Sequence, residues 1–141
     1  QNEEIVHLQT GCLLQEIYDY FLPKNKIIPA GSCGTVGIGG LSLGGGYGLF
    51  SRNYGLTCDN IIGLKMVGAD AKIYDSDEHP NLLWACKGGG NGNFGVVTQL
   101  RFKTHQAPEN LTSHVFKFRN LKTKTLQQCS SPHATAQQQA K

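Results

Sequence analysis

The chain has 141 residues, of which 13 are basic, 10 are acidic and 39% are hydrophobic, and its formal net charge is only +3. This balance of charge gives no case for nucleic acid or an anionic membrane surface as a partner. No apolar run approaches the roughly 20 residues of a membrane-spanning helix, so we expect one small globular domain with a core of its own.

The spacing of apolar residues predicts both strands and helices. Residues 5–8 form a short apolar run typical of a strand, and Leu14, Ile17 and Phe21 then recur at helical spacing. A turn that contains Asp70 joins two further apolar runs and predicts a hairpin. In chain order, the expected strands are residues 5–8, 27–28, 61–67, 72–74 and 96–102, and the expected helices are residues 13–21 and 80–87. Because these elements intersperse without a regular βαβ repeat, the fold class is α+β.

Glycine is the outlier in the composition. The chain has 18 glycines, most of them in segments 31–48 and 88–95, whereas average usage of about 7% would give roughly ten. A flexible linker would not interleave glycine with apolar residues such as Val36, Ile38 and Tyr47. The two clusters therefore indicate places where the backbone turns sharply and approaches a ligand closely.

One formal G-x-G-x-x-G pattern occurs, at Gly90, Gly92 and Gly95. A dinucleotide-binding fingerprint needs a strand before the glycines and a helix after them, so that the pyrophosphate meets the helix N-terminus. Here a helix is expected before the pattern and a strand after it. We therefore reject the Rossmann interpretation, and the absence of G-x-x-x-x-G-K-[ST] excludes a P-loop.

The segment Pro29–Gly48 is the stronger ligand candidate. Its successive glycines let consecutive N–H groups converge on one concavity, which suits a pyrophosphate, and the apolar residues between them can line a flat ring. Cys33 stands at the rim of this segment. It could be a thiolate nucleophile, a covalent tether or a small buried residue, and composition alone favours the buried residue.

The sequence from Pro29 to Asn60 resembles the FAD-binding domain of the berberine bridge enzyme-like oxidases, within the vanillyl-alcohol oxidase superfamily. Segments 81–98 and 67–71 extend the match, which covers about residues 5–118. The resemblance implies an FAD-binding PCMH-type fold, incomplete at both ends of the chain. We expect three parts: residues 1–106 as the C-terminal part of that domain, 107–120 as the start of a substrate domain, and 121–141 as a disordered tail, the last because it is polar and has no hydrophobic periodicity.

The resemblance also implies which residues hold FAD. Cys33 occupies the position of a cysteine that bonds flavin C6 in many members, so a covalent link is expected there. The remaining expected cofactor contacts are Thr35, Val36, Gly39, Gly40, Gly44, Tyr47, Gly48, Asp59, Asn60, Gly95 and Val97.

Two features of the family pattern are missing. A second tether, a histidine in an upstream R-x-G-G-H segment, does not occur, and His7 is rejected as its substitute because it matches a later strand. The family's catalytic base belongs to a substrate domain that the chain does not contain, so no catalytic residue is assigned. We expect a chain truncated at both ends.

The implied parent enzyme transfers a hydride from an alcohol or sugar-like small molecule to flavin N5, with molecular oxygen as the electron acceptor. Two alternatives stay open. The chain could be a non-catalytic truncated remnant that binds FAD weakly or not at all, or the glycine segment could bind another nucleotide. Secretion would fit the family, but no signal peptide is visible and the compartment is unknown.

Several other residues receive simpler interpretations. Trp84 is expected in the core of its helix, Cys58 and Cys86 as small buried residues, and the histidines 79, 105, 114 and 133 in solvent. Asp59 could contact the cofactor or bond the backbone of its own loop. No C-x-x-C pair occurs, so a zinc site is not expected. The triplet from Asn110 to Thr112 is an N-glycosylation sequon.

Overall fold

The computed structural model describes residues 4–112, so the predictions for the tail 121–141 and for His114 and His133 lie outside the described residues. The chain divides into two compact units, one that ends at Glu109 and one that begins at Asn110. All the helices and strands named below belong to the first unit. Within the described residues, no helix is long and apolar enough to cross a membrane.

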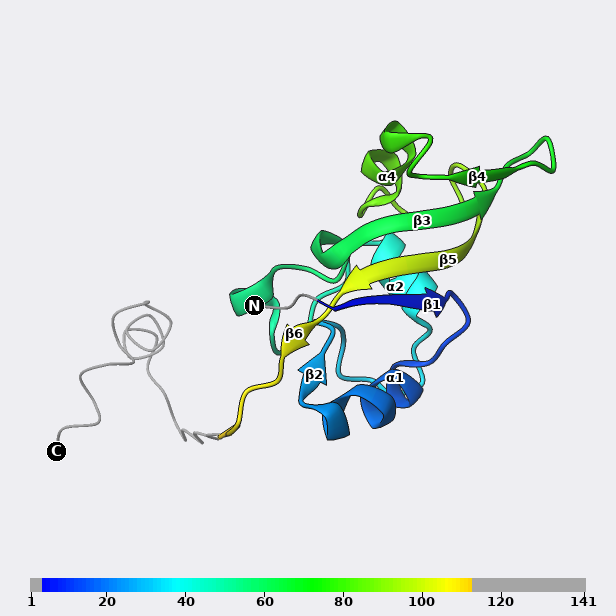
Figure 1. Ribbon diagram of the computed structural model, residues 1–141. Coiled ribbons are helices and arrows are strands. Elements are labelled where there is room, and N and C mark those ends of the chain that lie inside the picture. Colours follow the sequence, from blue (N-terminus) through cyan, green and yellow to red (C-terminus); the bar gives the residue numbers. More distant parts are fainter. Residues whose placement is uncertain (1–3, 113–141) are drawn as a thin grey trace, which may run out of the picture. The chain divides into compact units, whose positions relative to one another are not determined.

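A four-stranded antiparallel sheet is the framework of this unit, with strand order β1-β5-β3-β4 (Figure 1). β5 comes last of the four in the chain but lies inside the sheet, where it pairs with both β1 and β3. A second, two-stranded sheet joins β2 to β6. The strands are β1 (Ile5–Gln9), β2 (Lys26–Ile27), β3 (Ile61–Val67), β4 (Ile73–Asp75), β5 (Val96–Lys103) and β6 (His105–Gln106). All five predicted strands are confirmed, and only β6 was not expected.

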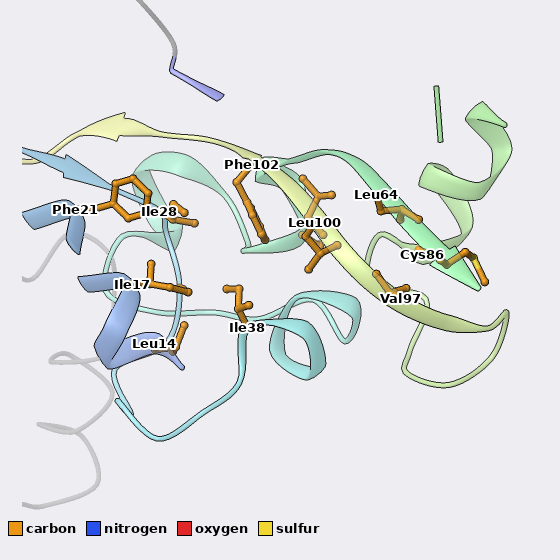
Figure 2. Packing of buried hydrophobic residues seen from close by; sticks show 14 residues of the cluster. Leu14, Ile17, Phe21, Ile28, Ile38, Leu64, Cys86, Val97, Leu100 and Phe102 are labelled. Atoms are coloured by element: carbon orange, nitrogen blue, oxygen red, sulfur yellow. The ribbon is translucent and has the colours of Figure 1, made fainter. Parts of the chain in front are cut away.

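One face of the sheet forms the hydrophobic core. Alternation along β5 turns Leu100 and Phe102 inward, where both are 0% exposed, and places Arg101 on the opposite face. Leu64 and Met66 of β3 continue the same buried surface. Figure 2 shows Leu100 and Phe102 of the sheet in one cluster with side chains from outside it, among them Leu14, Ile38 and Cys86, so the core lies between the sheet and elements from both before and after β3 in the chain.

Four α-helices accompany the sheet: α1 (Leu14–Phe21), α2 (Ile38–Leu43), α3 (Ser51–Tyr54) and α4 (Pro80–Cys86). α1 begins where the Glu16 carboxylate accepts a hydrogen bond from the Leu13 N–H, at 2.8 Å. It buries Leu14, Ile17 and Phe21, the residues whose spacing predicted it. The predicted helix over 80–87 is confirmed as α4. Two 3₁₀ turns lie at Leu22–Lys24 and Cys58–Asn60.

The prediction for Trp84 is wrong. The side chain is 83% exposed, because α4 turns Cys86 to the core and half-buries Leu82 and Leu83, and seven residues provide only one buried side. Apolar character alone did not reveal which side of so short a helix faces inward. Cys58 and Cys86 are buried as predicted, at 5% and 4% exposed.

Candidate functional site

The glycine-rich segment is held in place by the backbone of the β1–α1 connection. The Ile38 and Gly39 N–H groups donate to the carbonyls of Cys12 and Thr10, at 2.9 and 3.1 Å. In return, the Leu14 N–H donates to the Val36 carbonyl at 2.9 Å. These bonds connect segments more than twenty residues apart. They supply the partners that let glycine-rich sequence form α2, although glycine is a poor helix former.

The two ends of the segment border an open cavity of about 420 Å³. Their backbones also lie directly against each other, because a Cβ at Gly48 would collide with the Ala30 carbonyl oxygen. Gly48 also donates its N–H to the Ser51 hydroxyl at 2.9 Å, which joins the segment to α3. The cavity is lined by Leu14, Gly31, Ser32, Cys33, Val36, Leu41, Tyr47, Gly48 and Leu49.

Four predicted cofactor residues therefore line one cavity: Cys33, Val36, Tyr47 and Gly48. Cys33 is exposed at its rim, not buried as composition alone favoured. Tyr47 and Leu49 are 79% and 81% exposed, which is unusual for apolar side chains of this size. Leu49 was not predicted as a site residue, although it directly follows the predicted Gly48. The cavity thus has an apolar lining and one accessible thiol.

The glycines of α2 divide into two kinds. Gly39 is buried, and a Cβ there would lie 2.6 Å from the Cβ of Thr10, so packing accounts for its lack of a side chain. Gly40 is exposed, and a Cβ there would meet nothing within 4 Å. A Cβ at Gly44 would make only ordinary contacts, from 3.5 Å. Gly40 and Gly44 lie one turn apart, so α2 presents bare backbone on one exposed side.

The second glycine cluster, residues 88–95, contacts the end of the first. The Gly90 N–H donates to the Leu43 carbonyl at the C-terminus of α2, at 3.1 Å. Gly88 has a φ of +78° and lies against Gly45, which explains its need for glycine. The cluster follows helix α4 and precedes strand β5, so the rejection of a Rossmann fingerprint is confirmed.

The remaining predicted contacts lie outside the cavity lining. Thr35 is exposed beside Val36. A Cβ at Gly95, where φ is +153°, would collide with the Val67 carbonyl and the Met66 side chain, so the sheet itself requires glycine there. Val97 is buried, and its carbonyl accepts a hydrogen bond from the Thr10 hydroxyl at 2.9 Å.

Asp59 and Asn60 both bond the loop that follows α3. The Asp59 carboxylate accepts from the Leu56 N–H at 2.8 Å, which is the structural alternative that the sequence left open. Asn60 is 0% exposed and donates its amide hydrogens to the carbonyls of Tyr54 and Leu56, at 3.0 and 2.9 Å. Its polar atoms are committed to protein, so only its backbone is left for a cofactor.

The prediction that His105 is solvated is wrong. Its ring is half-buried and stacks on Tyr54, with the ring centroids 4.2 Å apart. Because the Asn60 amide nitrogen donates to two carbonyls, its oxygen must be the acceptor, and His105 Nε2 donates to it at 2.6 Å. His105 therefore fastens β6 to the loop after α3. Asp70 is a turn residue as predicted, since it accepts from the Lys72 N–H and the Tyr74 hydroxyl.

Burial raises the pKa of the Cys58 and Cys86 thiols, so both are protonated and poorly reactive at neutral pH. Neither residue lines the cavity. Among residues 4–112, no three His, Cys, Asp or Glu side chains gather in a way that could hold a metal ion.

Comparison with known proteins identifies the class of domain that carries this cavity and sheet. Residues 1–77 match the family described as an FAD binding domain. The chain is 46% identical over 108 residues to berberine bridge enzyme-like 8 of Arabidopsis thaliana, covering 74% of this chain and 20% of that protein. The chain therefore belongs to the FAD binding domain family and is similar to berberine bridge enzyme-like and other FAD-linked oxidoreductases, so its expected cofactor and α+β fold class are confirmed.

Solved structures agree with this assignment. A chitooligosaccharide oxidase is 34% identical and superposes with a TM-score of 0.70, over 77% of this chain and 24% of that one. Phl p 4, a grass pollen allergen with glucose dehydrogenase activity, is 34% identical with a TM-score of 0.69, over 74% of this chain and 22% of that one. The chain spans about a fifth to a quarter of the length of the curated relatives it matches.

Proposed function

We propose that the cavity between Cys33 and Tyr47 holds the ring system of FAD, and that the bare side of α2 lies along the rest of the cofactor. Cys33, Val36, Tyr47 and Gly48 line that cavity. The other proposed contacts are Thr35, Gly39, Gly40, Gly44, Gly95 and Val97, with Asp59 and the backbone of Asn60. The apolar lining fits a flat aromatic ring, so these residues are compatible with the cofactor of the family.

The observation that carries this proposal is the open surface at Gly40. An exposed glycine inside a helix costs about 1 kcal/mol relative to alanine, and nothing in the fold repays that cost because a Cβ there meets no atom within 4 Å. Close approach of a ligand to the backbone is the physical reason that accounts for glycine at such a position. Exposed Tyr47 and Leu49 add apolar surface that a bound ring would cover.

Cys33 is the proposed point of covalent attachment, as a thioether to flavin C6. Its thiol is exposed at the rim of the cavity, unlike the buried thiols of Cys58 and Cys86. Forming the bond removes one hydrogen from the thiol and one from the ring carbon, and molecular oxygen would accept both. The tether would hold the ring against Tyr47 and Val36 without relying on binding energy alone.

The proposed reaction of the parent enzyme is the oxidation of an alcohol or sugar-like small molecule. When bound, FAD would accept a hydride from the substrate carbon and pass two electrons to oxygen. The residues of this chain would bind and orient the cofactor, and none of them is proposed to move the substrate proton. Support for the substrate class comes from the chitooligosaccharide oxidase and the pollen glucose dehydrogenase. The alternative of a non-catalytic remnant is not favoured, because the named relatives are FAD-linked oxidoreductases.

The test uses the full-length protein that contains this chain. After acid precipitation and trypsin digestion, flavin absorbance and fluorescence should travel with the peptide 27–52, which contains Cys33. Cys33→Ala should remove flavin from that peptide, whereas Cys12→Ala, which changes a thiol outside the cavity lining, should leave it in place. Flavin-free 27–52 from a protein that still binds FAD would refute the tether alone. A protein that binds no flavin at all would refute the proposed function.

A further inference from the structure

The triplet Asn110-Leu111-Thr112 lies outside the cavity and has no part in the proposed flavin chemistry. It is the only N-x-[ST] triplet in the 141 residues, and neither its middle residue nor the following Ser113 is proline. We propose that Asn110 is an attachment site for an N-linked glycan. The proposal is independent of whether FAD binds.

Exposure is the first structural requirement for such a site, and the triplet meets it. Asn110, Leu111 and Thr112 are all exposed, and Leu111 retains 68% of its accessible surface. They form no helix or strand, so a transferase can bind them as extended chain. Within residues 4–112, no hydrogen bond ties down the amide of Asn110 or the hydroxyl of Thr112, the two groups that the transferase must engage.

Asn60 shows the opposite arrangement. It is 0% exposed, and all its amide hydrogens are used in bonds to the carbonyls of Tyr54 and Leu56. An asparagine of that kind could not be modified in the folded protein. Asn110 is exposed and its amide makes no hydrogen bond within residues 4–112, so the folded chain leaves it accessible to a transferase.

The site also lies close to a firmly anchored point of the chain. The Ala107 N–H donates to the Asn25 carbonyl at 2.9 Å, just after β6. Asn110 follows three residues later, where the first compact unit has ended. None of residues 107–112 lines the cavity.

The modification is a group transfer without redox change. The Asn110 amide nitrogen forms a bond to C1 of an oligosaccharide carried on a lipid diphosphate, the lipid diphosphate leaves, and the amide loses one proton. This co-reactant and its transferase act in the lumen of the secretory pathway, so the proposal implies that the parent protein passes through it. Cys58 and Cys86 are buried and would be shielded from oxidation there.

The decisive test uses the endogenous protein, captured with an antibody. Trypsin should release the peptide 104–117, which contains Asn110. Treatment with the amidase that removes N-glycans, in heavy-oxygen water, should convert Asn110 to an aspartate that carries the heavy isotope. Recovery of this peptide wholly unmodified, with unlabelled Asn110, would overturn the proposal.

A second test separates the acceptor residue from the fold. In a eukaryotic secretion host, the wild-type protein should migrate as a heavier, glycosidase-sensitive species. Asn110→Gln and Thr112→Ala should each lower the mass of that species by one glycan, Thr112→Ser should retain it, and Asn81→Gln, a change at an exposed asparagine outside any sequon, should leave it unchanged. An Asn110→Gln protein with the same glycosidase-sensitive shift as the wild type, or a secreted wild-type protein with no shift, would contradict the assignment.

Discussion

Gly39 lies directly against Thr10. Its N–H donates to the Thr10 carbonyl at 3.1 Å, and a Cβ on Gly39 would stand 2.6 Å from the Cβ of Thr10. Thr10 also donates its hydroxyl to the Val97 carbonyl in the sheet. The contact therefore sets the distance of α2 from the sheet, and with it the position of the cavity that α2 borders.

This contact predicts opposite effects of alanine at two adjacent glycines. Gly39→Ala should lower the free energy of unfolding by about 1–3 kcal/mol, because the added methyl group overpacks against Thr10. Gly40→Ala should raise it by about 0.4–1 kcal/mol, because alanine favours the helix and meets no neighbour. Urea denaturation of the two variants measures both changes.

The same pair separates folding from cofactor binding. If FAD lies along the bare side of α2, Gly40→Ala should weaken FAD binding while it stabilises the fold, and flavin fluorescence in a titration would report this. A stabilised Gly40→Ala variant with unchanged FAD affinity would contradict a cofactor contact at Gly40. It would leave the packing account of Gly39 untouched.

Regular periodicity was enough to predict β5 and α1. β5 and α1 place apolar residues at spacings of two and of three to four, and Leu100 and Leu14 are buried as that spacing requires. α2 could not be predicted in this way, because its helix depends on bonds to Cys12 and Thr10 and not on its own glycine-rich sequence. A helix that depends on hydrogen bonds to distant residues need not show helical periodicity in its own sequence.

The candidate site, like the fold, could be predicted only in part. The resemblance singled out Cys33 and Tyr47, and the structure brings them to one cavity. The resemblance could not reveal that the Asn60 amide is fully hydrogen-bonded within the protein, because one of its partners is His105, which is 45 residues away in the sequence. It also missed the exposure of Trp84, which follows from how α4 is rotated against the sheet.

Removing the amide of Asn60 should destabilise the protein. In Asn60→Ala the carbonyls of Tyr54 and Leu56 lose the Asn60 amide as a donor, and the bond between His105 Nε2 and Asn60 is removed. We expect a loss of about 1–3 kcal/mol in the free energy of unfolding. Asp59→Ala is the adjacent control, because it removes an exposed bond from the Leu56 N–H and a long one from the Cys58 thiol, and it should cost less. Equal losses in the two variants would show that the Asn60 bonds stabilise the fold no more than the exposed Asp59 bonds do.

The pair Arg101–Asp77 should make stability depend on pH. Hydrogen bonds from the Arg101 guanidinium, which lies over Gly63, hold the pKa of Asp77 below its usual range. The pair therefore stabilises the folded state above the unfolded pKa of about 3.9, and this contribution disappears as the pH falls through the lower folded pKa. Asp77→Asn should reduce stability at neutral pH but much less in acid, and Glu78→Gln serves as the exposed neighbouring control. A difference between wild type and Asp77→Asn that stays constant across this range would contradict the ion pair.

Alkylation should distinguish Cys33 from the buried thiols. Cys33 is exposed at the cavity rim, whereas Cys58 and Cys86 are 5% and 4% exposed and burial raises the pKa of both. Because the thiolate is the reactive form and must be reached by the reagent, brief treatment of the folded, flavin-free protein with iodoacetamide should label Cys33 first. Tryptic peptides 27–52, 53–65 and 73–87 report the three sites separately. Labelling of all three at one rate in the folded protein would contradict the burial of Cys58 and Cys86.

Added FAD should slow the labelling of Cys33 alone, because the proposed ring site adjoins the Cys33 sulfur. Equal labelling of Cys33 with and without bound FAD would place the cofactor elsewhere.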